Sequence, residues 1–243
     1  YSRNYLDVDT YNKLCVMKEV RISMPKMKND EDTDIVAYER EQVKALEEYF
    51  TGTNAETAYL LGCYCGLRIN ECYGLKWENV DLVHGTITID RQMQYQEGLI
   101  KLVPLKTRNA RRTVYMSEKL KSYFVELARQ RVADAEQLKG QREQNQTFIE
   151  DLDGEKVSSL ELVNSLSNGK IQTVNSMKYH SRTIKTELGI DFKFHHLRHT
   201  YGTRLAELNT PTHILCNQMG HASGKVTERY YLAVSKSGID ILV

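Results

Sequence analysis

The spacing of apolar residues predicts helices at both ends of the chain and strands between them. Val43, Leu46 and Phe50 recur at intervals of three or four residues, which is the spacing of one helix face. Residues 86–116 instead alternate apolar and polar positions, are rich in β-branched residues and include a turn residue, Gly98. We therefore expect an α+β fold that is mostly helical and contains a small antiparallel β-sheet.

Polar caps and turn residues mark further elements. Asn54 is placed to cap a second helix that includes residues 59–61, and Ser117 is placed to cap a long helix. Asp153 and Gly154 predict the turn of a hairpin.

Helices return towards the C-terminus. Apolar residues at helical spacing predict a helix over residues 174–188. Thr210 and Pro211 are typical of a helix start, and Gly220 is typical of a helix end. We expect His221 to be held in the turn after this short helix.

A linker separates the first part of the chain from the rest. Residues 24–33 contain a proline, lysines and an acidic cluster, with little that can pack. Residues 9–22 have helical apolar spacing and could be the last helix of another domain. We therefore divide the chain into the tail of an N-terminal domain with its linker, residues 1–34, and a second domain, residues 35–243. Because the first residue is not a methionine, we expect a fragment of a longer protein.

Composition excludes several classes of protein. The 243 residues are 41% hydrophobic and 27% charged, which suits a folded globular chain. The longest nearly apolar run, residues 58–67, is far shorter than the roughly 20 residues of a membrane-spanning helix. The net charge is only +1, from 33 basic and 32 acidic side chains. Any surface that binds DNA must therefore be local.

The cysteines favour a reduced, cytoplasmic protein. The five cysteines are odd in number and lie among apolar residues, which is typical of buried thiols rather than a disulfide framework. A zinc site needs ligand pairs at regular spacing, and Cys63 with Cys65 forms one tight pair. We expect no metal and no cofactor.

The first motif with chemical potential contains Arg68 and Glu71, which lie three residues apart at the start of a helix. An ordinary helix ion pair is one interpretation. Because Arg68 directly follows the apolar run, however, we expect it to be half-buried. A half-buried guanidinium usually has a fixed partner, such as a carboxylate or a phosphate.

The second motif contains His195, Arg198 and His199, which one helical turn would present together. Two other interpretations stay open. His195 and His199 could hold a metal, although no glutamate stands between them and no third ligand is near in the sequence. Alternatively, residues 196–220 could form a helix-turn-helix that only reads DNA.

The third motif contains His221, Tyr230 and Tyr231. Taken alone, tyrosines near a C-terminus are more often packing residues than nucleophiles. Together and in this order, the three motifs resemble the tyrosine recombinase, or phage integrase, family over residues 35–243. Two positions depart from the pattern of that family: His196 stands where an acidic residue is common, and Tyr231 directly follows Tyr230.

The resemblance implies a catalytic domain preceded by the end of a helical core-binding domain. It also implies that Glu71 braces an arginine of the site. The catalytic positions that it implies are Arg68, Lys106, His195, Arg198, His221 and Tyr230.

These residue types suit the cleavage of a phosphodiester without metal or ATP. A tyrosine phenol, with a pKa of about 10, needs nearby cations to become a nucleophile. Arg68 and Arg198 would clamp the phosphoryl oxygens, and Lys106 is the candidate general acid. His195 could assist proton transfer and His221 could hydrogen-bond the phosphate. The resemblance implies a 3′-phosphotyrosine intermediate, which stores the bond energy for rejoining.

We therefore expect a site-specific DNA recombinase, an integrase that serves the integration or excision of a mobile element. A recombinase that resolves dimers or inverts segments is an alternative, as is a non-catalytic helix-turn-helix protein that binds DNA. The expected partner is double-stranded DNA. The resemblance implies a homotetramer on DNA in which the apolar tail, residues 232–243, packs on a neighbouring protomer, although docking within one chain is an alternative.

Local basic residues are candidates for DNA contacts, or for a solvated basic loop. They fall in an acid-free stretch over residues 101–112, after the turn at Gly98, and on one face of the helix over residues 174–188. The candidates are Lys101, Arg108, Arg111 and Arg112 in the first group, and Lys178, Arg182 and Lys185 in the second.

Overall fold

The computed structural model describes residues 9–10, 35–96, 98–221 and 224–240. The chain divides into two units, residues 1–34 and 35–243. The helix predicted over residues 9–22 and the linker after it lie almost entirely outside the described residues. The assignment of the first unit to a preceding domain therefore stays a prediction.

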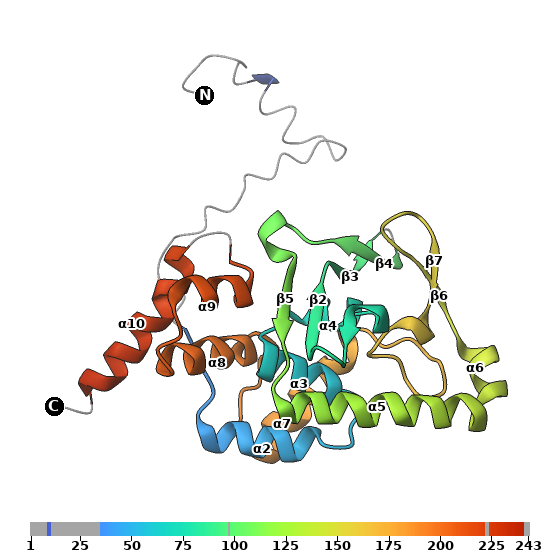
Figure 1. Ribbon diagram of the computed structural model, residues 1–243, viewed down its shortest axis with the longest axis horizontal. Coiled ribbons are helices and arrows are strands. Elements are labelled where there is room, and N and C mark those ends of the chain that lie inside the picture. Colours follow the sequence, from blue (N-terminus) through green and yellow to red (C-terminus); the bar gives the residue numbers. More distant parts are fainter. Residues whose placement is uncertain (1–8, 11–34, 97, 222–223, 241–243) are drawn as a thin grey trace. The chain divides into compact units, whose positions relative to one another are not determined.

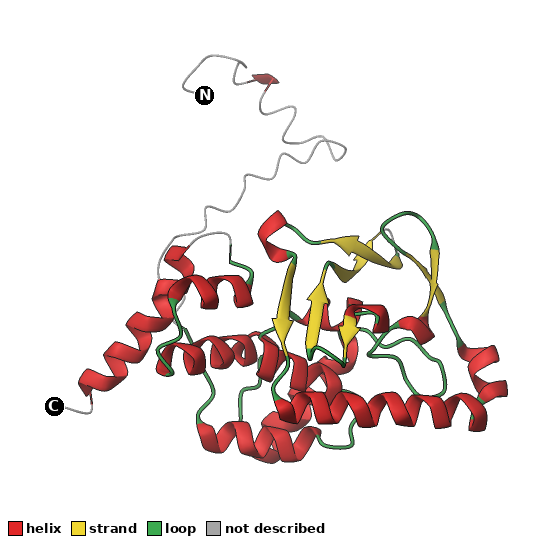
Figure 2. Ribbon diagram, in the orientation of Figure 1, coloured by secondary structure: helices red, strands yellow, loops and turns green. Residues whose placement is uncertain are grey.

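Helices form most of the second unit, as predicted (Figure 2). The longer helices are α2 (Arg40–Phe50), α3 (Glu56–Cys65), α4 (Ile69–Gly74), α5 (Glu118–Gln137), α6 (Lys139–Asn145), α7 (Asn175–Leu188), α8 (Phe194–Glu207), α9 (Thr212–Met219) and α10 (Gly224–Asp240).

The strands form two small sheets rather than the single sheet that we expected. One sheet has the order β1-β2-β5 and the other β3-β4-β6-β7. Their bounds are β1 (Val80–Asp81), β2 (Thr86–Ile89), β3 (Arg91–Gln96), β4 (Leu99–Pro104), β5 (Arg112–Tyr115), β6 (Phe148–Glu150) and β7 (Lys156–Ser158). All pairs are antiparallel except β4 with β6, which is parallel and aligns Lys101 with Glu150. The predicted turn at Gly154 joins β6 to β7.

The core surrounds α3, whose side chains are buried on nearly every face. The predicted face of α2 packs into the same core through Val43, Leu46 and Phe50. Gly62 lets α8 approach closely, because a Cβ atom there would lie 2.8 Å from the Phe194 ring. This contact fixes α8, which carries the second motif.

The caps show where local sequence decided the structure. The backbone N–H of Leu120 donates to Ser117 Oγ at 3.3 Å at the start of α5, as predicted. Gly220 ends α9 with a left-handed φ of 60°, also as predicted. The prediction for Asn54 was wrong: its Oδ1 accepts a hydrogen bond from His180 Nε2 at 2.9 Å and does not cap α3. Asn54 therefore bonds to a residue distant in the sequence instead of capping the helix that follows it.

Figure 1 shows how the second unit is arranged: α8, α9 and α10 gather at one end, while α6, β6 and β7 lie at the other. Strands β2 and β5 stand between these groups. The three motifs converge where β5 meets the helical end. In the part of the chain that the structure describes, no helix is long and apolar enough to cross a membrane.

Two glycines provide a test of this packing. Gly74 ends α4 against β3, and a Cβ atom there would lie 2.7 Å from the backbone nitrogen of Met93. We expect Gly74→Ala to lower the free energy of unfolding by about 1–3 kcal/mol, because the backbone of β3 would have to move to make room for the methyl group. Gly140 lies in α6 with nothing within 4 Å of an added Cβ, so Gly140→Ala should raise the free energy of unfolding by about 0.4–1 kcal/mol. Urea unfolding measures both, and equal effects would contradict the close contact.

Candidate active site

The centre of the site is a buried carboxylate held by two arginines. Glu71 accepts hydrogen bonds from the backbone N–H and the Nη1 of Arg68, both at 2.8 Å. Arg112 donates to the same carboxylate through Nη2 at 2.9 Å and Nη1 at 3.2 Å. Burial alone would raise the pKa of Glu71, but Arg112 and then Arg68 outweigh it and lower this pKa to about 2. Glu71 is therefore ionised at neutral pH and binds both cations.

The position of Arg112 corrects its prediction as a DNA contact. Its side chain is fully buried, and it also donates from Nε to the Gln218 carbonyl at 2.9 Å and from Nη1 to the Ala110 carbonyl at 3.0 Å. No surface is left for a phosphate. Residues alternate along β5, so that Arg112 and Val114 face inwards together, and this period-two signal could have identified Arg112 as a buried residue.

Arg198 lies in α8, also buried. Its Nη1 donates to the Gly66 carbonyl at 2.5 Å and its Nη2 donates to the Met219 carbonyl. Burial lowers the pKa of Arg198 to about 9, helped by the charges of Arg68 and Arg112, so it stays a cation at neutral pH. Three guanidinium groups thus lie around one carboxylate, and this excess positive charge favours an anion.

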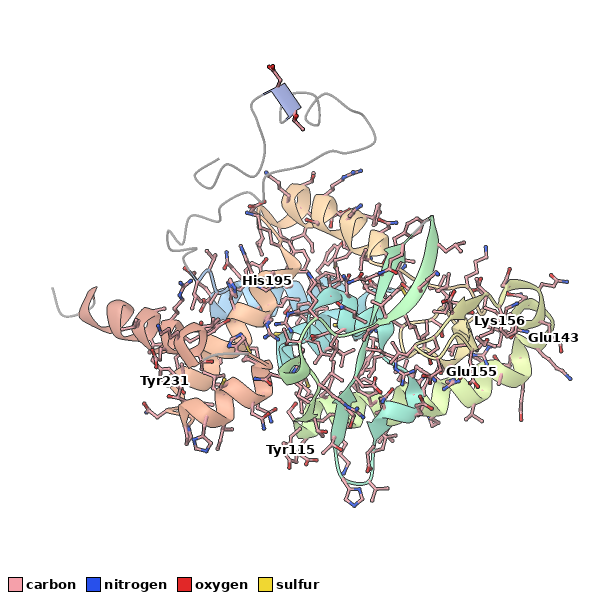
Figure 3. The ribbon with its side chains drawn as sticks, turned by 90° about the horizontal axis from the view of Figure 1, so that it is seen from above. Tyr115, Glu143, Glu155, Lys156, His195 and Tyr231 are labelled. Atoms are coloured by element: carbon pink, nitrogen blue, oxygen red, sulfur yellow. The ribbon has the colours of Figure 1, made fainter. Side chains whose placement is uncertain are left out.

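A cleft of about 400 Å³ opens beside this cluster. Arg68, Lys106 and His195 all line it, which brings together three of the predicted catalytic residues. Lys106 is exposed in the loop between β4 and β5, and part of the His195 side chain is open to solvent in α8 (Figure 3). Partial burial, followed by the charges of Arg198 and Arg68, lowers the pKa of His195, so its imidazole is neutral at physiological pH.

The third motif lies against the same cations. Tyr230 in α10 is 3% exposed, and its ring stacks on that of His221 with 6.1 Å between centroids. Burial raises the pKa of Tyr230, and the charges of Arg198 and Arg68 offset part of this rise. Both arginines therefore interact electrostatically with the phenol. Burial, helped by Arg198, lowers the pKa of His221 to about 3, and its Nδ1 lies 2.9 Å from Thr227 Oγ1.

The neighbouring Tyr231 has a different environment. Its hydroxyl donates to the Thr210 carbonyl, in the turn between α8 and α9 (Figure 3). Tyr231 therefore supports the end of α8, whereas Tyr230 lies beside His221.

The other predicted DNA contacts are dispersed. Lys101 forms an ion pair with Glu150 at 3.1 Å, although no acidic residue is near it in the sequence. The side chain of Arg108 lies outside the described residues. The remaining candidates are exposed and stay predictions: Arg111, Lys178, Arg182 and Lys185.

Among the residues that the structure describes, no group of three or more histidines, cysteines or carboxylates could hold a metal ion. His195 and His199 do lie close, with ring centroids 4.6 Å apart. Cys63, Cys65 and Cys72 are buried free thiols, and burial raises the pKa of each.

The arrangement can hold a tetrahedral oxyanion and offer it a hydroxyl nucleophile. Arg68 and Lys106 face the cleft as donors, and Tyr230 lies within reach of the same electrostatic field. Cations beside a cleft and a tyrosine in their field are the groups that attack by a phenol on a phosphodiester requires.

Residues 37–237 match the Phage integrase family, and the chain belongs to this family. Two curated relatives are each 28% identical to it and cover 84% of the chain. They are "Tyrosine recombinase XerC-like" from Caldanaerobacter subterraneus subsp. tengcongensis, matched over 215 residues, and "Prophage ps2 probable integrase" from Lactococcus lactis subsp. lactis, matched over 220 residues. The chain spans about half the length of these relatives, 51% and 53%.

Solved structures share the fold. The Tn1549 transposon integrase in complex with circular intermediate DNA superposes with a TM-score of 0.66 at 20% identity, covering 96% of this chain and 75% of that one. The XerA recombinase gives a TM-score of 0.55 at 19% identity, covering 80% of this chain and 59% of that one. The expected mostly helical α+β catalytic fold is thereby confirmed.

The Glu71 cluster predicts a pH-dependent stability. A carboxylate whose pKa is lower in the folded than in the unfolded chain stabilises the fold above its unfolded pKa, and this contribution is lost as pH falls through the folded value. Glu71→Gln should lower the free energy of unfolding at pH 7 by about 3–5 kcal/mol, because Arg112 is left buried without its partner. The gap to the wild type should narrow between about pH 5 and pH 2.

The matched control is Glu126→Gln, which removes an exposed ion pair with Arg129. We expect no measurable change in urea unfolding for this variant. A Glu71→Gln variant that behaves like the control would contradict the central role of the cluster.

Proposed function

We propose that this chain cleaves and rejoins DNA at specific sites through a 3′-phosphotyrosine formed by Tyr230. The observation that carries the proposal is the position of the Tyr230 phenol in the field of Arg68 and Arg198, beside His221. A phenol in such a field becomes a nucleophile once a phosphodiester enters and the cations bind its oxygens.

The roles of the other groups follow from their surroundings. Arg68 binds the phosphoryl oxygens directly, because it keeps 39% of its side chain exposed beside the cleft. Arg198 attracts the phosphate mainly through its charge, because two of its nitrogens already donate to carbonyl groups. Lys106 is exposed on a loop and can approach the leaving 5′-oxygen as general acid. His195 is neutral and can accept a proton.

The biological role that we propose is integration or excision of a mobile element. Support comes from two proteins that are similar to this chain, a prophage probable integrase and a transposon integrase. The substrate would be double-stranded DNA, and the reaction would need neither a metal ion nor ATP, because protein side chains fill every catalytic role. We further propose a homotetramer on DNA in the cytoplasm, with residues 232–243 packed on a neighbouring protomer. The last three of these residues, and the side chains from 235 onwards, lie outside the described residues.

The two adjacent tyrosines test the nucleophile. We expect Tyr230→Phe to abolish the covalent complex with DNA while DNA binding persists, because only the reacting oxygen is removed. Tyr231→Phe should still form the complex, since its hydroxyl binds the Thr210 carbonyl. Denaturing gel electrophoresis in EDTA detects the adduct. If Tyr231→Phe is inactive and Tyr230→Phe still forms the adduct, Tyr231 is the nucleophile.

The same assay tests the independence from metal. We expect the wild type to form the adduct in EDTA, because protein side chains fill the proposed catalytic roles. If EDTA abolishes the adduct of the wild type, the reaction needs a metal.

Lys106 is tested through the leaving group. A positioned general acid contributes roughly 100- to 10,000-fold, so Lys106→Ala should slow cleavage by that order. A substrate with sulfur in place of the bridging 5′-oxygen leaves as a thiolate, whose conjugate acid has a pKa of about 8.5, and needs no proton. The variant should then regain the wild-type rate of adduct formation.

The matched control is Arg68→Ala, which should stay impaired on both substrates because charge develops on the phosphoryl oxygens with either leaving group. Equal impairment of Lys106→Ala on both substrates would show that this lysine holds phosphate and donates no proton.

A further inference from the structure

The ring of Tyr230 lies in a narrow slot on one face of α8. His195, His199, Gly202 and Ala206 follow each other at intervals of four, three and four residues, so they share that face. His221, which lies outside α8, stacks on the Tyr230 ring. We call His199 the wall of the slot and Gly202 its floor, and His221 covers the ring.

His199 forms the wall. Its ring meets Tyr230 edge to face with 6.2 Å between centroids, and it meets His195 edge to face at 4.6 Å. One imidazole thus touches both the proposed nucleophile and a residue that lines the cleft. The Nδ1 of His199 is buried and has no hydrogen-bond partner in the structure.

Gly202 forms the floor. A Cβ atom at this position would lie 2.6 Å from Cε1 of Tyr230 and 3.0 Å from its Cζ, closer than side-chain atoms approach each other. Glycine is otherwise unfavourable inside a helix, where alanine is better by about 0.5–1 kcal/mol. The three heavy atoms nearest to a Cβ at Gly202 all belong to the Tyr230 ring, so this ring is what limits the position to glycine.

The segment that contains Val36 and Tyr38 contacts α8 beside His199. The backbone of Val36 lies beside the His199 ring and favours its protonated form, but burial and the charges of His195 and His196 prevail and lower the pKa of His199 to about 4. Tyr38 donates its backbone N–H to Thr200 Oγ1 at 2.8 Å, and Lys193 donates its own N–H to the Tyr38 hydroxyl at 2.7 Å. His199 is thus a neutral ring, and these hydrogen bonds join the segment that contains Val36 to both ends of the helical turn around it.

We propose that His199 and Gly202 are positioning residues for Tyr230: together they fix the direction in which its hydroxyl meets the scissile phosphate. This inference rests on the proposed function. Neither residue takes part in proton transfer or binds DNA. Their effect is on the rate of attack, because a misplacement of about 1 Å can cost roughly 100-fold in rate.

The test separates the rate of attack from the amount of folded protein. The DNA carries a nick that lets the cleaved 5′-hydroxyl strand dissociate, so cleavage cannot be reversed. With this DNA in excess, the amplitude of covalent adduct gives the fraction of competent protein, and the rate constant gives the chemistry of that fraction. We expect His199→Ala, which opens the slot, to lower the rate constant by about 10- to 100-fold at unchanged amplitude and unchanged DNA affinity. His199→Phe keeps a ring of similar shape and should recover most of the rate.

Gly202→Ala tests the slot from the other side, by overfilling it. It should also lower the rate constant, although alanine favours the helix. Gly140→Ala makes the same substitution where nothing is near and should leave the rate unchanged. His180→Ala removes a buried histidine that binds Tyr49 and Asn54, remote from the slot, and should reduce the stability or the amplitude but not the rate constant.

The outcomes are distinct. Wild-type rate constants for both His199→Ala and Gly202→Ala, or losses confined to the amplitude, would overturn the positioning roles and leave the proposed function intact. If His199→Ala does not fold, Gly202→Ala alone decides between these results. Failure of the wild-type chain to form an adduct would overturn the proposed function and the positioning roles together.

Discussion

The buried contact between Glu71 and two guanidinium groups is the interaction on which the site depends. Arg112 and Arg198 are both removed from water, and two such cations repel each other strongly in a medium of low dielectric constant. The ionised Glu71 carboxylate offsets this repulsion and fixes the direction of Arg68. Without it, the first motif would be an exposed arginine on a short helix.

Helix ends supply the rest of the stabilisation. Arg198 binds the carbonyl of Gly66, which caps α3, and the carbonyl of Met219, the last residue of α9. Arg112 binds the carbonyl of Gln218 in the same turn of α9. The last carbonyl groups of a helix lack partners within it and carry the negative end of its dipole, so they suit buried cations. The same bonds that solvate the arginines therefore join α3, α9 and β5.

Local sequence signals predicted the elements, and contacts between distant segments decided what they could not. The apolar spacing of α2, the cap at Ser117 and the stop at Gly220 depend on neighbouring residues, and all three predictions were confirmed. The alternation along β5 does place Arg112 on the inward face, but its partner Glu71 lies 41 residues away, so no local signal predicts the contact between them. The slot around Tyr230 was not predicted either, because Gly202 in α8 and Tyr230 in α10 meet only through the packing of two helices.

The burial of Tyr230 has a consequence for the free protein. Tyrosinate, rather than neutral phenol, reacts with most electrophiles, and the low exposure of Tyr230 both raises its pKa and shields its ring. The side chains of Tyr95 and Tyr179, in contrast, are exposed to solvent. The proposed nucleophile is thus shielded in the free chain, and a reactive probe aimed at tyrosines would label the surface long before it reached Tyr230.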